Sequence, residues 1–245
     1  MEEKNLDCCC CNEFDNKENC VVCGKPLVYF NEMRMLKCSI CGKEKSANAS
    51  CVDGHFVCDD CHSGGGAEIL SFLMKSKEKD PVALFLQVCA LKSVHMHGPE
   101  HHSIIPCVLV TAYRNNGGEI DFEDCLNEAW NRGKKVPGGA CGFLGACGAA
   151  VGAGIFASIL CEATPLTGDV WHVPQEMTME CLKRLIQIGG PRCCKRVGRQ
   201  AIEAAVEHVK ERYGIEMPLS KPVCSFSHKN RECLHERCPY FTDNV

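Results

Sequence analysis

A chain of 245 residues with 23 cysteines is long for a disulfide scaffold, and its formal net charge of −4 is mild. The first residues include no apolar stretch that would serve as a secretory signal, so we expect a reducing cytoplasm in which thiols act as metal ligands or redox groups. Residues 1–65 carry 7 Lys and Arg against 11 Asp and Glu, so DNA is not expected as a partner and RNA is disfavoured.

Residues 1–63 are predicted to form a small zinc-binding head of the treble-clef or cross-brace kind. The head holds three Cys-x-x-Cys pairs, and a glycine after each of the first two supplies the turn that aims both thiolates at one ion. With the Cys51/His55 pair, the head has four ligand pairs. If the first and third pairs bind one ion and the second and fourth bind another, the order resembles RING-type fingers and predicts about two structural zinc ions. The expected ligand sets are Cys20, Cys23, Cys51 and His55, and Cys38, Cys41, Cys58 and Cys61.

The fourth ligand of the first set has competitors. They are the consecutive cysteines Cys8 to Cys11 and the histidine His62. Neighbouring thiols cannot readily share one tetrahedral ion, so Cys8 to Cys11 could cap this site, bind metal transiently or belong to a tail. A closed four-ligand zinc site stabilises a fold, so the head is expected to support folding or docking and not catalysis.

Helical periodicity dominates after Gly64-Gly65-Gly66 and predicts an all-helical domain over residues 64–217. Asp80 and Pro81 fit the start of one helix, and Gly214 fits the end of the last one. No alternation typical of strands occurs outside the head. The expected helices cover, in chain order, 67–79, 81–94, 104–114, 122–131, 141–160, 178–188 and 193–213.

Residues 136–160 contain no charged side chain. A membrane-spanning helix needs about 20 mainly apolar residues, so this stretch is a candidate span. Seven glycines lie between Gly138 and Gly154. Such a composition fits close packing against another helix better than contact with lipid. We therefore predict that the protein does not insert into a membrane.

Polar residues gather in the turn before the helix predicted at residue 104. Histidines in such a cluster could ligate iron, nickel or zinc, or move protons near neutral pH. A polar turn between two helices is the alternative. The residues concerned are His95, His97, Glu100, His101 and His102.

Three cysteine-bearing blocks follow one another in the helical domain. The first is His101-His102-Ser-Ile-Ile-Pro106-Cys107, the second runs from Pro137 through Cys141 to Gly152, and the third is Ile188-Gly-Gly-Pro-Arg-Cys193-Cys194. Their layout resembles the C-GCAxxG-C-C family of redox-active helical proteins, with the best match at Cys147-Gly-Ala-Ala-Val-Gly152. This resemblance implies roles for Cys107, Cys147 and Cys193 at a redox or cofactor site.

The whole chain also resembles an uncharacterised cysteine-rich domain family of anaerobic bacteria and methanogens, which is sometimes joined to methyltransferase domains. That resemblance implies a partner protein such as a methyltransferase or a redox enzyme. Neither resemblance implies a substrate.

Cys193 and Cys194 begin the last predicted helix, where the helix dipole and nearby basic residues favour thiolate. Because adjacent cysteines form only a strained disulfide, two different roles are expected for them. With Cys147 they are the candidate catalytic thiols. The alternative is a solvated basic turn with incidental thiols.

The tail, residues 218–245, carries Cys224, Cys233 and Cys238, and Pro239 follows the last of them. This order resembles iron–sulfur ligation, with either a fourth ligand supplied by the helical domain or one iron left without a protein ligand. A third zinc, with His228 or His235, is the alternative.

The sequence therefore predicts a cytoplasmic metalloprotein with zinc in its head and an iron–sulfur cluster or redox thiols elsewhere, which handles electrons or sulfur for a partner enzyme. The competing hypothesis is a zinc-dependent adaptor that docks to a protein or RNA without chemistry of its own. No phosphate-binding loop, hydrolase or kinase motif is present.

Overall fold

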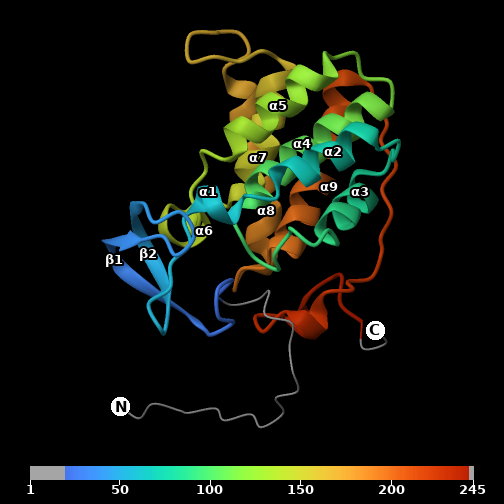
Figure 1. The fold of residues 1–245 in the computed structure, drawn as a ribbon. Coiled ribbons are helices and arrows are strands. Elements are labelled where there is room, and N and C mark those ends of the chain that lie inside the picture. Colours follow the sequence, from blue (N-terminus) through green and yellow to red (C-terminus); the bar gives the residue numbers. More distant parts are fainter. Residues whose placement is uncertain (1–19, 243–245) are drawn as a thin grey trace.

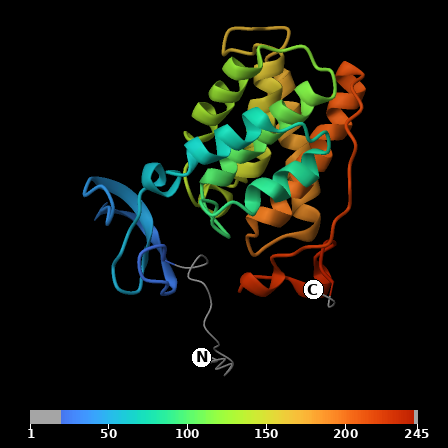
Figure 2. The same ribbon diagram turned by 45° about the vertical axis from the view of Figure 1, so that its right-hand side comes forward.

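The computed structural model describes residues 20–242 and shows a mainly helical protein that carries a β-hairpin at its N-terminal side (Figure 1). The predicted fold class is confirmed. Cys8 to Cys11 lie outside the described residues. In Figure 2 the hairpin and the helical bundle lie side by side, and the C-terminal segment lies below the bundle.

The head is built on strands β1 (Leu27–Lys37) and β2 (Glu44–Cys51) and ends in the short helix α1 (Asp59–His62). The strands pair antiparallel, from Leu27 opposite Cys51 to Lys37 opposite Glu44, with an irregularity between Tyr29 and Arg34. Gly24 and Gly42 have φ values of +73° and +70°, a conformation that glycine adopts without strain. These two turns therefore follow the Cys-x-x-Cys pairs as the sequence predicts.

The helical body packs around α4, whose residues from Ser103 to Tyr113 are buried throughout. Helices α5, α7, α3, α2 and α9 contact α4, and α8 covers α7 and α9. The bounds of the body helices are α2 (Gly66–Lys75), α3 (Pro81–Cys89), α4 (Glu100–Asn115), α5 (Phe122–Gly133), α6 (Ala140–Phe143), α7 (Gly148–Leu160), α8 (His172–Ile188) and α9 (Cys194–Tyr213).

Two capping predictions are confirmed. Asp80 is the N-cap of α3, and its carboxylate accepts hydrogen bonds from the N–H groups of Val82 and Ala83 at 2.8 and 3.0 Å. Gly214 follows α9 with a φ of +66°. Both residues satisfy helix-end groups that would otherwise lack partners.

The glycine-rich stretch does not form the single helix expected over residues 141–160. It forms α6 and α7, and Gly145 lies between them with a φ of +69°, which a continuous helix cannot contain. Cys147 becomes the N-cap of α7. In addition, α4 and α8 begin four and six residues earlier than predicted, because their N-cap residues are Pro99 and Trp171 rather than a recognisable Ser, Thr, Asp or Asn.

Close helix packing explains the glycines of α7. A Cβ on Gly154 would overlap Thr178 Oγ1 of α8 and lie 2.9 Å from the carbonyl oxygen of Pro174. Among the described residues, no helix combines the length and the apolar character needed to cross a membrane.

After α9 the chain runs beside the bundle and ends beneath it, where the turns η1 (Ser227–Lys229) and η2 (His235–Arg237) lie (Figure 1). Tyr240 donates a hydrogen bond to Glu203 of α9 at 3.0 Å, and Arg199 stacks on the Tyr240 ring at 3.6 Å. These contacts hold the tail against the first half of α9.

Candidate metal centres

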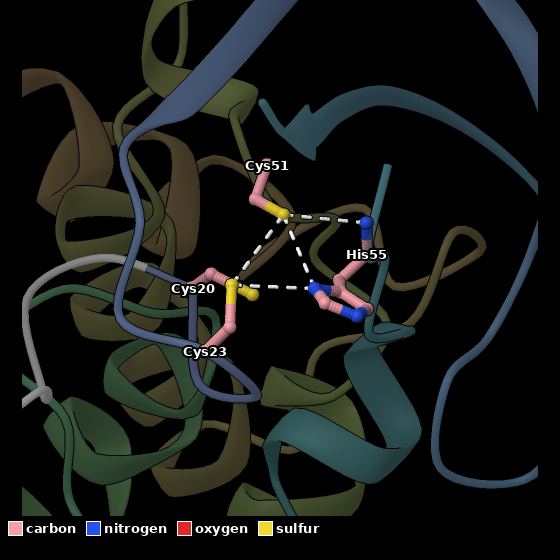
Figure 3. Close-up of side chains that lie close together, drawn as sticks. All are labelled: Cys20, Cys23, Cys51 and His55. Carbon is pink, nitrogen blue, oxygen red and sulfur yellow. Dashed lines mark hydrogen bonds between the residues drawn. The ribbon is translucent and has the colours of Figure 1, made fainter. Parts of the chain in front are cut away.

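The first group of candidate ligands brings three thiols and one imidazole together at the end of the hairpin (Figure 3). Sγ of Cys23 lies 3.8 Å from Sγ of Cys51, and Nδ1 of His55 lies 3.2 and 3.4 Å from these two sulfurs. Tetrahedral zinc with bonds of about 2.3 Å to sulfur and about 2.0–2.1 Å to nitrogen places sulfurs about 3.8 Å apart and nitrogen about 3.5 Å from sulfur. The spacing therefore fits one tetrahedral ion, with Cys20 as the remaining ligand.

The second group contains four thiols from the other turn of the hairpin and from α1. Sγ of Cys41 lies 3.8 Å from Sγ of Cys58, again the separation expected on one zinc ion. Cys38 and Cys61 complete the group. The two groups use the ligand pairs alternately, so the structure gathers the eight residues in the crossed order that the sequence predicts.

Backbone N–H groups point at the sulfurs of both groups. Cys58 N–H donates to Cys38 Sγ at 3.4 Å, and His55 N–H donates to Cys51 Sγ at 3.3 Å. Burial opposes ionisation of Cys38, but its N–H neighbours outweigh burial and lower the thiol pKa to about 6. Thiolate is the form that binds metal, and the N–H groups favour it at Cys38, whereas burial and the neighbouring thiols raise the pKa of Cys61 to about 12.

A third arrangement of thiols lies between the start of α9 and the tail. Here a pocket is lined by Cys193 and by all three tail cysteines, together with apolar and aromatic side chains such as Phe226 and Tyr240. The sequence predicted Cys193, Cys224, Cys233 and Cys238 as cofactor ligands, and the structure places these four around one space.

The pocket thiols are not arranged for a single ion. Among the described residues, only three groups have three or more candidate ligand atoms within 4.8 Å of one another, and none of them contains a tail cysteine. Thiolates of an iron–sulfur cluster bind different iron atoms, so their sulfurs lie farther apart than those on one zinc ion. The described structure therefore does not place Cys193 and the tail cysteines as ligands of one zinc ion.

Basic side chains line the same pocket. Arg199 is 2% exposed, and within residues 20–242 its Nε, Nη1 and Nη2 atoms have no hydrogen-bond partner. Cys224 and Cys238 lie within electrostatic range of this guanidinium. The stacked Tyr240 ring and the Glu203 carboxylate also act on this guanidinium, so a positive charge faces the pocket without a hydrogen-bond partner among the described residues.

Cys194 faces a different environment from Cys193. Its thiol interacts with His97, whose Nε2 lies 2.8 Å from Oε2 of Glu232 in the tail. Burial alone would raise the pKa of Cys194, but His97, the N–H of Gly98 and Lys195 lower it below the usual value. Burial opposes the charged form of His97 as well, yet Cys194 and Glu232 raise its pKa to about 9. The pair is therefore suited to a thiolate beside an imidazolium.

The other two predicted site cysteines are not brought to the pocket. Cys147 is half-buried near Cys141 and Cys194, and burial raises its thiol pKa to about 11. Cys107 lies in the apolar core with its thiol directed at the carbonyl oxygen of Leu126, and burial raises its pKa. Cys107 therefore belongs to none of the ligand groups found in the described part of the chain.

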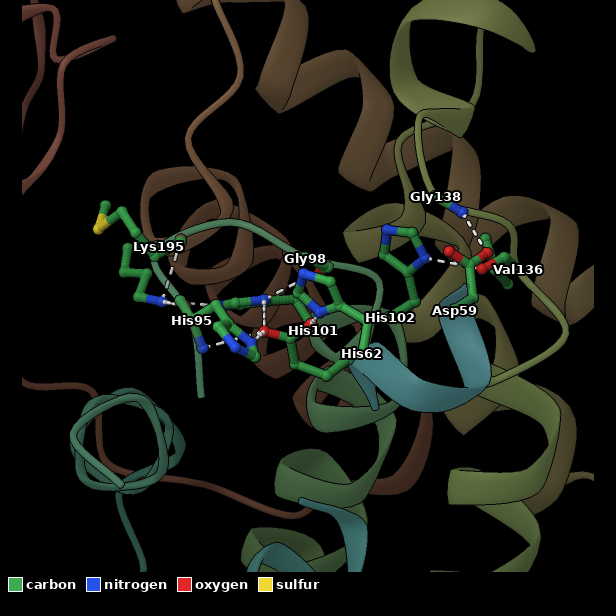
Figure 4. Close-up of polar contacts among 11 residues, drawn as sticks. Asp59, His62, His95, Gly98, His101, His102, Val136, Gly138 and Lys195 are labelled. Carbon is green, nitrogen blue, oxygen red and sulfur yellow. Dashed lines mark hydrogen bonds and ion pairs between the residues drawn. The ribbon is translucent and has the colours of Figure 1, made fainter. Parts of the chain in front are cut away.

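The histidines of the polar turn serve separate purposes (Figure 4). His102 Nδ1 lies 2.9 Å from the carbonyl oxygen of Val136, and His101 Nδ1 lies 3.1 Å from that of Gly98. His95 faces Glu100, together with His62 of the head. His62 is therefore not the competing ligand of the first group. The contact between His62 and Glu100 joins residues far apart in the chain, and so does the contact between His97 and Cys194. No local sequence pattern predicts either contact.

Residues 69–241 match the model of DUF5714, a family of unknown function. No curated protein and no solved structure matches the chain. The matched range includes the four pocket cysteines and the polar turn, and it begins after the two ligand groups of the head.

Proposed function

The chain belongs to DUF5714, a family of unknown function. For this member we propose an iron–sulfur protein whose zinc-binding head joins it to a partner enzyme. The observation that carries the proposal is the pocket between α9 and the tail, because four thiols and a buried guanidinium without a hydrogen-bond partner among the described residues line one space. A cluster held there would exchange single electrons with the partner.

The head is proposed to hold two structural zinc ions. The sulfur–sulfur separations of 3.8 Å support zinc in both groups. All four coordination positions would then be closed, so the head has a structural role and the chemistry belongs to the body.

The pocket must open to admit a cluster. Its enclosed volume is about 20 Å³, little more than one water molecule needs. Three of the four thiols belong to the tail, so assembly of the cluster requires an outward shift of the tail around it.

Cys194 gives the site a second proposed capability. It follows Cys193 directly, and its pKa is lowered beside His97. The Cys194 thiolate could attack the outer sulfur of a persulfide donor, forming a Cys194 persulfide while the donor leaves as a thiol, so we assign the thiol chemistry to Cys194, with Cys147 nearby.

The experiment is anaerobic purification followed by iron, sulfide and visible absorbance measurements. Cys224→Ser and Cys238→Ser should remove the brown charge-transfer absorbance and the bound iron, with the zinc content unchanged. Cys125→Ser is the matched control, because Cys125 is half-buried on α5 and does not line the pocket. Wild-type protein without iron, or variants that keep it, would contradict the proposal.

A specific observation also favours the adaptor hypothesis. The hairpin exposes several large apolar side chains, which suits contact with a protein. They are Val28, Tyr29, Met33, Met35 and Ile40. Colourless protein that still binds a partner through these residues would support an adaptor without redox chemistry.

A further inference from the structure

Glu100 is a deeply buried carboxylate at the first turn of α4, with a side chain that is 1% exposed. Two imidazoles flank it: Nδ1 of His62 lies 3.0 Å from Oε2, and Nδ1 of His95 lies 3.3 Å from Oε1. A buried charge persists in a protein only when it is paired or bound to a metal. The two imidazoles that pair with the Glu100 carboxylate belong to a residue type that commonly binds metal ions.

The geometry of the three side chains fits one ion. Their candidate ligand atoms all lie within 4.8 Å of one another. Ligand atoms about 2.1 Å from a shared ion are separated by about 3.0 Å in octahedral and about 3.4 Å in tetrahedral coordination. The nitrogen–oxygen distances, 3.0 Å from His62 to Oε2 and 3.3 Å from His95 to Oε1, lie in this range, with the two imidazoles facing different oxygens of the carboxylate.

Such a site would keep open coordination positions. The three protein ligands are two histidines and one carboxylate, the set found in catalytic zinc sites and in non-haem iron sites. The side chains of His62 and His95 are 17% and 22% exposed, so water can reach the ion from their side. The arrangement differs from the closed four-ligand groups of the head.

The surroundings hold these ligands in place. Lys195 donates hydrogen bonds to the carbonyl oxygen of Met96 at 3.1 Å and to Nε2 of His101 at 2.9 Å. His101 thus has both ring nitrogens occupied and is not available as a ligand. A Cβ on Gly98 would overlap Glu100 and lie 2.5 Å from Cε1 of His62, so only glycine permits this approach.

We propose that His62, His95 and Glu100 form a third metal site, which binds one divalent transition-metal ion such as Zn²⁺, Fe²⁺ or Co²⁺. The site joins the head to the body, because His62 follows the head ligand Cys61 and Glu100 begins α4. The proposal is independent of the iron–sulfur cluster, since it shares no ligand with the pocket.

The test uses full-length, zinc-loaded protein that has been washed with a weak chelator, which leaves the closed zinc sites filled. The protein is dialysed against Co²⁺, and the metals bound per chain are counted. We expect Glu100→Gln and His95→Ala each to bind one Co²⁺ fewer than wild type, with equal zinc. His172→Ala is the control, because His172 is an exposed histidine beside Glu176 on α8; it should bind as much Co²⁺ as wild type.

The proposal is overturned if wild type and His95→Ala bind the same amount of Co²⁺, including none. Thermal unfolding of each variant shows whether it folds. Should Glu100→Gln fail to fold, His95→Ala still decides the question, because His95 is at the surface of the site. Cobalt bound at the pocket cysteines would be present in wild type and in both variants, so it would not produce the expected difference of one Co²⁺ per chain between them.

Discussion

Cys193 and Cys194 are neighbours that face different surroundings. Consecutive helical positions are rotated by about 100°, so adjacent side chains at a helix start point to different sites. Cys193 lines the pocket, and burial raises its thiol pKa to about 12. Cys194 lies beside His97, and its pKa is lowered. The basic residues near the pair therefore do not act on both thiols alike.

This difference predicts selective alkylation. In zinc-loaded protein without a cluster, iodoacetamide at about pH 7 should modify Cys194 faster than Cys193 and Cys147, because the lowered pKa of Cys194 increases its thiolate fraction. Peptide mass spectrometry measures the rates. His97→Ala should slow modification of Cys194 and leave the other two rates unchanged. Equal rates for the three thiols in wild type would show that His97 does not activate Cys194.

The limits of sequence reasoning are visible in these residues. The two cysteines of a Cys-x-x-Cys pair are brought together by a local turn, so the head ligands could be predicted from their spacing in the sequence. The partners His97 and Cys194 are separated in the sequence by most of the helical body, whereas His62 and Glu100 are 38 positions apart and lie on the two sides of the junction between head and body. Only the packing of α1, α4 and α9 brings them together, and no local pattern encodes that packing.

The helices α7 and α8 depend on small residues where they meet. Gly154 and Thr178 are in close contact, whereas a methyl group added to the exposed Gly142 of α6 would meet no described atom within 4 Å. Glycine composition indicated close packing but not the break at Gly145, because a glycine in a left-handed turn and a glycine at a helix contact look alike in sequence.

Gly154→Ala should therefore destabilise the protein by about 1–3 kcal/mol, the usual cost of overpacking a core contact. Gly142→Ala is the matched control and should change the free energy of unfolding by less than about 0.5 kcal/mol. Chemical denaturation followed by circular dichroism in the far ultraviolet measures both. Equal effects of the two substitutions would contradict the close α7–α8 contact.

Head, body and tail meet at the start of α9. Arg192 lies 5.3 Å from the ring centroid of Tyr29 in β1 and 3.7 Å from Glu232 in the tail. A second contact joins head and body, because Asp59 of α1 accepts a hydrogen bond from the N–H of Gly138 at 2.9 Å. The two ligand groups of the head, the pocket and the polar turn are therefore parts of one connected structure.

Zinc should hold the head together independently of the body. Cys38→Ser should release one zinc ion and unfold residues 20–62, because a small head without a core depends on metal for its stability. The helical circular dichroism of the body should persist. Ser39→Ala, an exposed neighbour, is the control and should keep both ions. Zinc analysis after a chelator wash gives the count, and unchanged zinc in Cys38→Ser would contradict the crossed ligand sets.

The most direct measurement is the iron and acid-labile sulfide content of wild-type protein purified without oxygen. The pocket of Cys193, Cys224, Cys233 and Cys238 predicts iron and sulfide in equal amounts, because iron–sulfur clusters contain both, with zinc retained in the head. Colourless protein that contains zinc but neither iron nor sulfide, even after reconstitution with both, would contradict the assignment of the pocket as a cluster site.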